Sequence, residues 1–137
     1  MTMATIKSFT DLQQSKKLAE ILPIESADMY YQYVLPKSSK IKHNPEIGNP
    51  VNALKWYNKG YTTSGKEPIT LDEYCVPCWS LAALLDVLPR IENLKPVLDL
   101  EFNYVQYAYD IDLSATGDNP IDACVAMIEK LNELNLL

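Results

Sequence analysis

The residues best suited to chemistry are two cysteines in the segment Cys75-Val-Pro-Cys78, a C-x-x-C spacing near the middle of the chain. An extended segment, residues 69–76, leads here into the start of a helix, and a helix N-terminus lowers the pKa of a nearby thiol. That arrangement is typical of thioredoxin-like redox sites. No βαβ unit precedes the motif, so two ordinary buried cysteines at the start of a core helix fit the sequence better. A thiol redox or metal-binding role for Cys75 and Cys78 is retained as the alternative function.

A structural zinc site needs four ligands, and besides this pair the chain offers only His43 and Cys124 as soft ligands. Cys124 falls on the apolar stripe of a helix, where a cysteine usually acts as a small hydrophobic residue. His43 is the only histidine and lies in a polar loop, where we expect it to face solvent. No nucleophile elbow, phosphate-binding glycine loop or metalloprotease motif accompanies it. We therefore assign no metal site, cofactor or catalytic residue, and a non-enzymatic protein is favoured.

Pairs of carboxylates are a further source of chemistry, because two of them can bind a cation or share acid–base work. Acidic residues on the wet face of a sheet or helix normally only keep a surface soluble, which is the expectation here. A small hydrolase built from acidic residues far apart in the sequence is a third class that one sequence leaves open. The three pairs are Glu25 with Asp28, Asp72 with Glu73, and Asp110 with Asp112.

Tyrosine is unusually frequent, with nine residues in the chain. Strand propensity explains much of this, because aromatic side chains pack well on a pleated sheet. Tyrosines that remain outside the core, for instance Tyr30 with Tyr104, are predicted to form an exposed aromatic patch of the kind that binds protein partners or sugars. Six of the nine lie in two strand-like runs: Tyr30, Tyr31, Tyr33, Tyr104, Tyr107 and Tyr109.

The overall composition excludes several classes of protein. A formal charge of -6 repels nucleic acid and anionic membrane surfaces, and no block of like charges imitates a DNA backbone. Residues 1–17 lack the apolar run of a secretory signal, and no stretch approaches the ~20 apolar residues of a membrane span. Three cysteines in such a chain are expected to be reduced thiols. The sequence thus predicts a cytoplasmic protein without nucleic acid or membrane as a partner.

Three amphipathic helices are predicted to position these residues. The first starts at a capping box formed by Thr10 and Gln13, carries the stripe Leu12, Leu18, Ala19 and Leu22, and stops at Pro23. The second starts near Ser80, carries Leu81, Leu84, Leu85 and Leu88, and stops at Pro89. The third starts at Asn119 and Pro120 and carries Ile121, Cys124, Val125, Ile128 and Leu131.

Strands are predicted where aromatic residues or period-2 patterns occur. Residues 29–34 form one strand, and residues 38–49 form a polar loop after it. Apolar residues alternate at even positions from Leu98 to Phe102 and at odd positions from Val105 to Leu113, which requires a bulge or a turn near Asn103. Alternation of this kind is typical of antiparallel sheets with one wet face. Residues 51–61 suit a helix and a strand equally well.

Three segments taken together resemble a family of small uncharacterised proteins from gut Bacteroidales and their phages or mobile elements. They are QSKKLAEILPIESADMYY at 14–31, PCWSLAALLDVLP at 77–89 and NPIDACVAMIEKLNEL at 119–134. The resemblance implies a bacterial or phage cytoplasmic protein. That family has no established activity, so the resemblance assigns no functional residue, and its P-x-W-S-L segment does not depend on flanking cysteines.

These observations predict a single α+β domain over residues 1–137, with a small, mainly antiparallel sheet packed against about three amphipathic helices. The leading functional hypothesis is a non-enzymatic accessory or interaction protein of a phage or mobile element. It would bind another protein, or a second copy of itself, through a tyrosine-bearing or loop surface.

Overall fold

A computed structural model describes residues 7–107 and 113–137 of the chain. Within these residues it contains five α-helices, one 3-10 helix and two three-stranded antiparallel sheets, so the predicted α+β class is confirmed. The chain forms two compact units. The first unit is residues 11–79, and the second unit is the described part of residues 1–10 and 80–137. The single domain over residues 1–137 stays a prediction.

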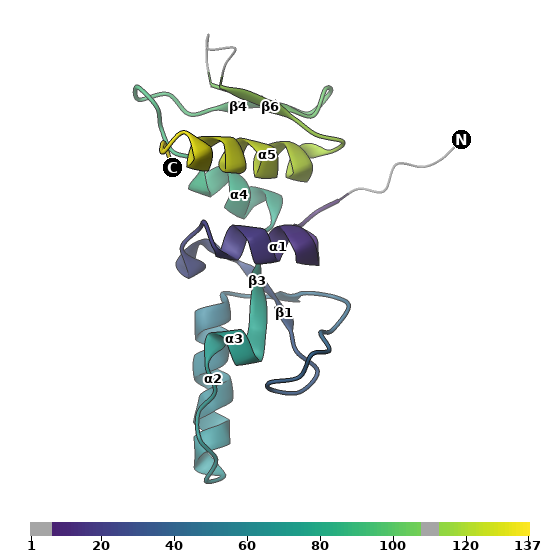
Figure 1. Cartoon of the computed structure of the whole chain (residues 1–137), viewed down its shortest axis with the longest axis vertical. Helices are drawn as coiled ribbons and strands as arrows, with labels where there is room; N and C mark the ends of the chain where they lie inside the picture. The colour runs from purple at the N-terminus through teal and green to yellow at the C-terminus, as the bar shows by residue number, and fades with distance from the viewer. Residues whose placement is uncertain (1–6, 108–112) are drawn as a thin grey trace, which may run out of the picture. The chain divides into compact units, whose positions relative to one another are not determined.

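The sheet of the first unit has the order β2-β1-β3. Figure 1 labels β1 and β3. Strand β1 is Met29–Gln32, which confirms the strand predicted from the aromatic run. Strand β2, Glu46–Ile47, lies in the segment that we predicted to be loop, and that prediction was wrong for these two residues. Both β2 side chains are exposed, so no apolar pattern in the sequence marks the strand. It pairs antiparallel with β1, with Ile47 opposite Met29 and Glu46 opposite Tyr30.

Strand β3 is Cys75–Cys78, so the C-x-x-C segment is itself the edge strand of this sheet. The extended segment predicted over residues 69–76 is interrupted by α3, a single helical turn at Leu71–Tyr74. This turn forms because the Glu73 carboxylate accepts a hydrogen bond of 3.0 Å from the backbone N–H of Thr70. Pro77 is tolerated in β3 because an edge strand leaves one side of its backbone unpaired.

Helix α1, Leu12–Ala19, starts one residue later than predicted. Its capping box is formed by Asp11 and Gln14, because this pair has the same three-residue spacing as Thr10 and Gln13 and aspartate is an equally strong N-cap. Ser15 and Leu18 form its buried stripe, whereas Ala19 is exposed, contrary to the prediction. The helix packs against β3.

Residues 51–61, which suit a helix and a strand equally well by sequence, are helical and belong to α2, Pro50–Thr63. Its start is stabilised by Asn49, whose side-chain oxygen accepts the backbone N–H of Val51 at 3.0 Å. The helix continues two residues beyond the undecided segment and ends at Thr63. The short 3-10 helix at Ile24–Ser26 completes the unit and holds Trp79, whose indole N–H donates to the Ser26 hydroxyl at 2.9 Å.

The second unit is built in layers (Figure 1). Its sheet has the order β4-β5-β6, with β4 Val97–Asp99, β5 Tyr104–Gln106 and β6 Ser114–Thr116. Helix α5, Pro120–Glu133, packs against β5 and β6, and α4, Leu81–Val87, packs against α5. Ser80 and Asn119 cap the two helices as predicted. The whole predicted stripe of α5 is buried: Ile121, Cys124, Val125, Ile128 and Leu131.

The predicted change of register near Asn103 is confirmed as a turn between β4 and β5, where Asn103 has φ 49. Leu100 and Phe102 were predicted to share the buried face with Leu98, and this was wrong, since they are 67% and 70% exposed. The reason is that the turn starts directly after β4, because an Asp99 carboxylate oxygen accepts the backbone N–H of Glu101 at 2.9 Å. The strand residues predicted after it, 108–112, lie outside the described residues.

Among the described residues, no helix has the length and apolar character that crossing a bilayer requires.

Candidate functional site

The two cysteines of the C-x-x-C segment do not form a common site. Side chains alternate along a strand, so Cys75 and Cys78, three residues apart in β3, project from opposite faces of the sheet. An extended span of this length separates their Cα atoms by about 10 Å, more than the ~7 Å that a disulfide can bridge. Both are free thiols and are 3% and 0% exposed. A disulfide between Cys75 and Cys78 could form only if β3 lost its extended conformation.

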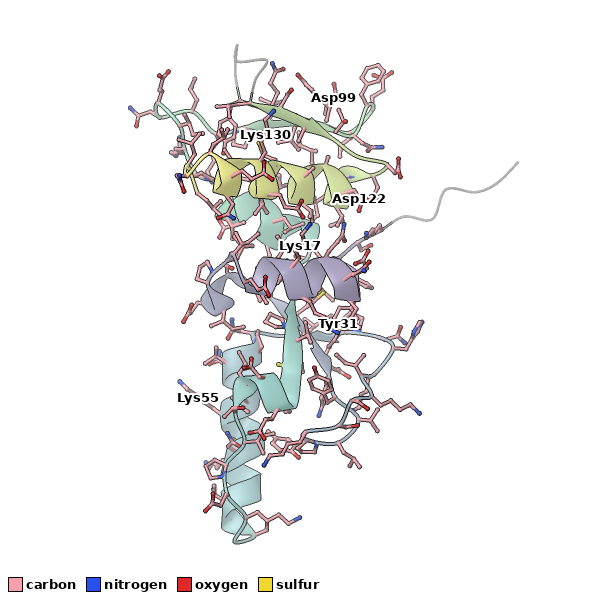
Figure 2. The ribbon with its side chains drawn as sticks, viewed as in Figure 1. Lys17, Tyr31, Lys55, Asp99, Asp122 and Lys130 are labelled. Carbon is pink, nitrogen blue, oxygen red and sulfur yellow. The ribbon has the colours of Figure 1, made fainter. Side chains whose placement is uncertain are left out.

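The surroundings of the two thiols also differ. Cys78 shares its face with Tyr31, which is labelled in Figure 2 and whose side chain is hydrogen-bonded to that of Cys78. Burial, and then this neighbour, raise the pKa of Tyr31 far above its usual value. On the other face, burial first and the Asp72 charge second raise the pKa of Cys75 to about 12. A reactive cysteine needs the opposite shift, so the thiol alternative gains no support from this geometry.

The remaining residues considered for chemistry lie apart from one another. In residues 7–107 and 113–137 no three or more histidine, cysteine, aspartate or glutamate side chains come together as metal ligands would. His43 is exposed, and Cys124 is buried in α5, where burial raises its pKa to about 11. Glu73 has a lowered pKa because it accepts the Thr70 backbone N–H and then because it lies beside Lys37, at 3.2 Å. The pair Asp110 and Asp112 lies outside the described residues.

Tyr30 lies in the first unit, in a cluster of tyrosines. Its ring is 5.8 Å from that of Tyr74, which lies 5.0 Å from that of Tyr57 on α2. The cluster joins β1 to α2 and α3 and surrounds the buried Cys75. Tyr30 is therefore half-buried and helps to pack this unit. Tyr104 lies in the second unit, so a single patch containing both tyrosines stays a prediction.

Tyr104 occupies the middle strand of the second sheet, on its outer face. Val105, its neighbour, is fully buried and pairs with Leu98 and Ala115, which places these three on the face that α5 covers. By alternation, the opposite face carries Tyr104 at its centre. The residues around it on that face are Val97, Asp99, Gln106, Ser114 and Thr116, all of them exposed or half-buried.

Exposed apolar side chains gather beside this outer face, along the hairpin of β4 and β5. Val97, Leu100 and Phe102 are 64%, 67% and 70% exposed, within six residues of one another. Sequence reasoning missed Leu100 and Phe102 because their alternation with Asp99 and Glu101 imitates a half-buried strand. The available signal was the Asp99-to-Asn103 segment itself, since aspartate and asparagine both favour tight turns. We call Val97, Leu100, Phe102 and Tyr104 the hairpin surface.

Each unit has a surface cleft lined by described residues. The larger, about 530 Å³, lies in the second unit and is lined by Ala82, Leu85, Asp86, Lys95, Pro96 and Leu98. The smaller, about 370 Å³, lies in the first unit and is lined by Pro36, Lys37, Lys66, Glu67, Pro68 and Ile69. Neither cleft contains a cysteine, His43 or a tyrosine, so neither brings together the residues that the sequence marked for chemistry.

Comparison of the chain with models of protein families, with curated proteins and with solved structures finds no match.

Proposed function

We propose that this chain is a non-enzymatic protein-interaction protein that uses the hairpin surface of the second unit to bind another protein. The observation that carries the proposal is the concentration of exposed apolar residues in one hairpin, next to an aromatic residue at the centre of the sheet face opposite α5. Soluble proteins rarely leave such residues grouped together unless a partner covers them. Its place would be the cytoplasm of a bacterium, as an accessory factor of a phage or mobile element.

The chemistry of the hairpin surface suits a protein partner. Phe102 and Tyr104 are aromatic, and aromatic residues supply much of the binding energy in protein interfaces. Asp99 is half-buried beside them, and its carboxylate is occupied by the backbone N–H groups of the turn, which holds the hairpin in one conformation. A preformed surface loses less conformational entropy when a partner binds.

The test is photo-crosslinking of the full chain, expressed in a gut Bacteroidales host that carries a phage or mobile element encoding a protein of the similar family. A photoreactive benzoylphenylalanine in place of Phe102 should crosslink to a defined protein. The same substitution at Ile47, which is 88% exposed in the first unit, serves as the matched control and should not crosslink to that protein. Adding Tyr104→Ala to the Phe102 variant should reduce the crosslink by about 10-fold or more.

The fold of each variant is checked by circular dichroism before the crosslinking result is interpreted. The proposal is wrong if residues 102 and 47 crosslink to the same set of proteins, or if residue 102 crosslinks to nothing while the chain remains a monomer.

A further inference from the structure

Helix α2 has two faces of different character. Its inner face packs Ala53, Leu54 and Tyr57 against the cluster of Ile69, Tyr74 and Cys75. Asn58 fixes this packing, because its side chain accepts the backbone N–H of Ile69 at 2.9 Å and donates to the Ile69 carbonyl at 3.0 Å. The helix is thereby held in one rotational setting, and its other face must point outward.

That outer face carries Asn52, Lys55, Trp56 and Lys59, all exposed and spaced to lie within a single stripe of the helix. Trp56 is 73% exposed, whereas the other tryptophan of the chain, Trp79, is fully buried. The Lys59 ammonium lies 5.1 Å from the centre of the Trp56 ring. Figure 2 shows the Lys55 side chain extending from α2 on the side away from α3.

The charge of this face differs from that of the chain as a whole. Helix α2 contains two lysines and no acidic residue, although the chain has a formal charge of -6. Within the part of the chain that the structure describes, neither Lys55 nor Lys59 takes part in an ion pair. The two residues are four apart on a helix, so their charged groups project from neighbouring turns.

An exposed tryptophan beside two lysines that form no ion pair among the described residues is suited to binding. Tryptophan has a large apolar surface and only two rotatable side-chain bonds, so burying it against a partner gains much and costs little conformational entropy. The lysines add a charge requirement, since a partner must place carboxylates opposite them. A negative chain with only two cations on this face is a poor match for a polyphosphate backbone.

We infer that the outer face of α2 binds an acidic helical segment of a partner protein. That segment would place two carboxylates one helical turn apart opposite Lys55 and Lys59, with an apolar side chain beside them against Trp56. This surface belongs to the first unit and shares no residue with the hairpin surface. The two proposals therefore succeed or fail independently.

The experiment titrates the full chain with a synthetic helical peptide of about 18 residues, five turns, that carries a leucine stripe flanked by glutamates four residues apart. Trp56 fluorescence is the signal, and Trp56→Phe should abolish it because Trp79 is buried. We expect saturable binding with a Kd on the order of 10–100 µM that weakens several-fold when salt rises from about 50 mM to about 300 mM. The same peptide with lysines in place of glutamates should not bind.

Charge-reversed variants locate the site. Lys55→Glu with Lys59→Glu should weaken binding by about 10-fold or more. Lys16→Glu with Lys40→Glu, two exposed lysines elsewhere in the first unit, changes the net charge equally and should stay within about 2-fold of the unmodified chain.

The inference is overturned by any of three results. The first is no saturable change at peptide concentrations up to about 1 mM. The second is an equal loss in both charge-reversed variants, which would show general charge attraction. The third is tighter binding of an oligothymidylate of the same charge as the peptide, which would identify nucleic acid as the ligand.

Discussion

Burial decides the chemistry of single residues in this chain. Cys75 and Cys124 lie in apolar surroundings, and in each case loss of solvent is the largest cause of the raised pKa. The same cause acts on Tyr107, whose pKa is raised to about 12 and whose hydroxyl donates to the Pro89 carbonyl at 2.7 Å. A neutral thiol or phenol tolerates such a site, but the ionised form does not. These residues therefore stabilise the fold only while they keep their protons.

The pH dependence of stability follows from these shifts. Unfolding restores ordinary pKa values, so between the unfolded pKa of a cysteine, 9.0, and the folded value for Cys75, about 12, the unfolded chain binds fewer protons than the native chain. Stability must then fall as pH rises through this window. We expect the free energy of unfolding in urea to drop by about 2 kcal/mol from Cys75 alone between about pH 8 and about pH 10.5. Cys75→Ala, although less stable at neutral pH, should show a shallower decline, and parallel pH profiles for the two proteins would contradict this account.

At the scale of elements, Gly117 and Gly60 differ in how much space their surroundings leave for a side chain. A Cβ at Gly117 would lie 2.5 Å from the Ala123 backbone nitrogen, because the chain passes here from β6 into α5 at close approach. Gly60, on the exposed side of α2, has no atom within 4 Å of such a Cβ. The same residue type is therefore required at one site and only tolerated at the other.

Alanine at these two positions should change stability in opposite directions. Gly117→Ala forces backbone atoms apart and should destabilise the chain by about 1–3 kcal/mol. Gly60→Ala removes unfolded-state freedom from a helix interior and should stabilise it by about 0.5–1 kcal/mol. Chemical denaturation of both variants measures the two effects, and a neutral Gly117→Ala would mean that the junction of β6 and α5 is looser than the structure shows.

At the scale of the whole molecule, charge is distributed unevenly. Residues 11–79 contain eight lysines and eight acidic residues, whereas residues 80–137 contain three basic and ten acidic ones. With Lys7 included, the whole formal charge of -6 comes from residues outside 11–79. The first unit is thus neutral overall and carries the lysine-bearing face of α2, while the second unit is acidic and carries the hairpin surface.

Cooperativity tests the predicted single domain. Each unit contains about half of the 137 residues, a size at which an isolated core is marginally stable, so we expect one shared unfolding transition. In the Trp56→Phe background, Leu131→Ala in the second unit should lower the urea midpoint reported by Trp79 of the first unit, at a cost of about 2–5 kcal/mol. An unchanged Trp79 midpoint, with loss of amide protection confined to the second unit, would establish two domains.

Local signals predicted much of the fold. Period-3.6 stripes and capping residues located α4 and α5 closely, because a cap and the stripe that follows it act within a few residues of one another. The capping box of α1 was predicted one residue too early, because Thr10 with Gln13 has the same spacing as the observed pair, Asp11 with Gln14. Strand β2 was missed because a two-residue strand with exposed side chains exists only through its pairing with β1.

The sequence by itself determined the α+β class, the amphipathic helices and the surplus of acidic residues, since each depends on residue type and short-range spacing. Only the tertiary structure decided which candidate residues come together and which are exposed. Cys75 and Cys78 are separated because β3 is extended. Tyr30 is half-buried because it packs against α2 and α3, and Phe102 is exposed because it lies in the turn at Asn103. These outcomes depend on which face of an element meets another element, and that is a property of contacts between residues far apart in the chain.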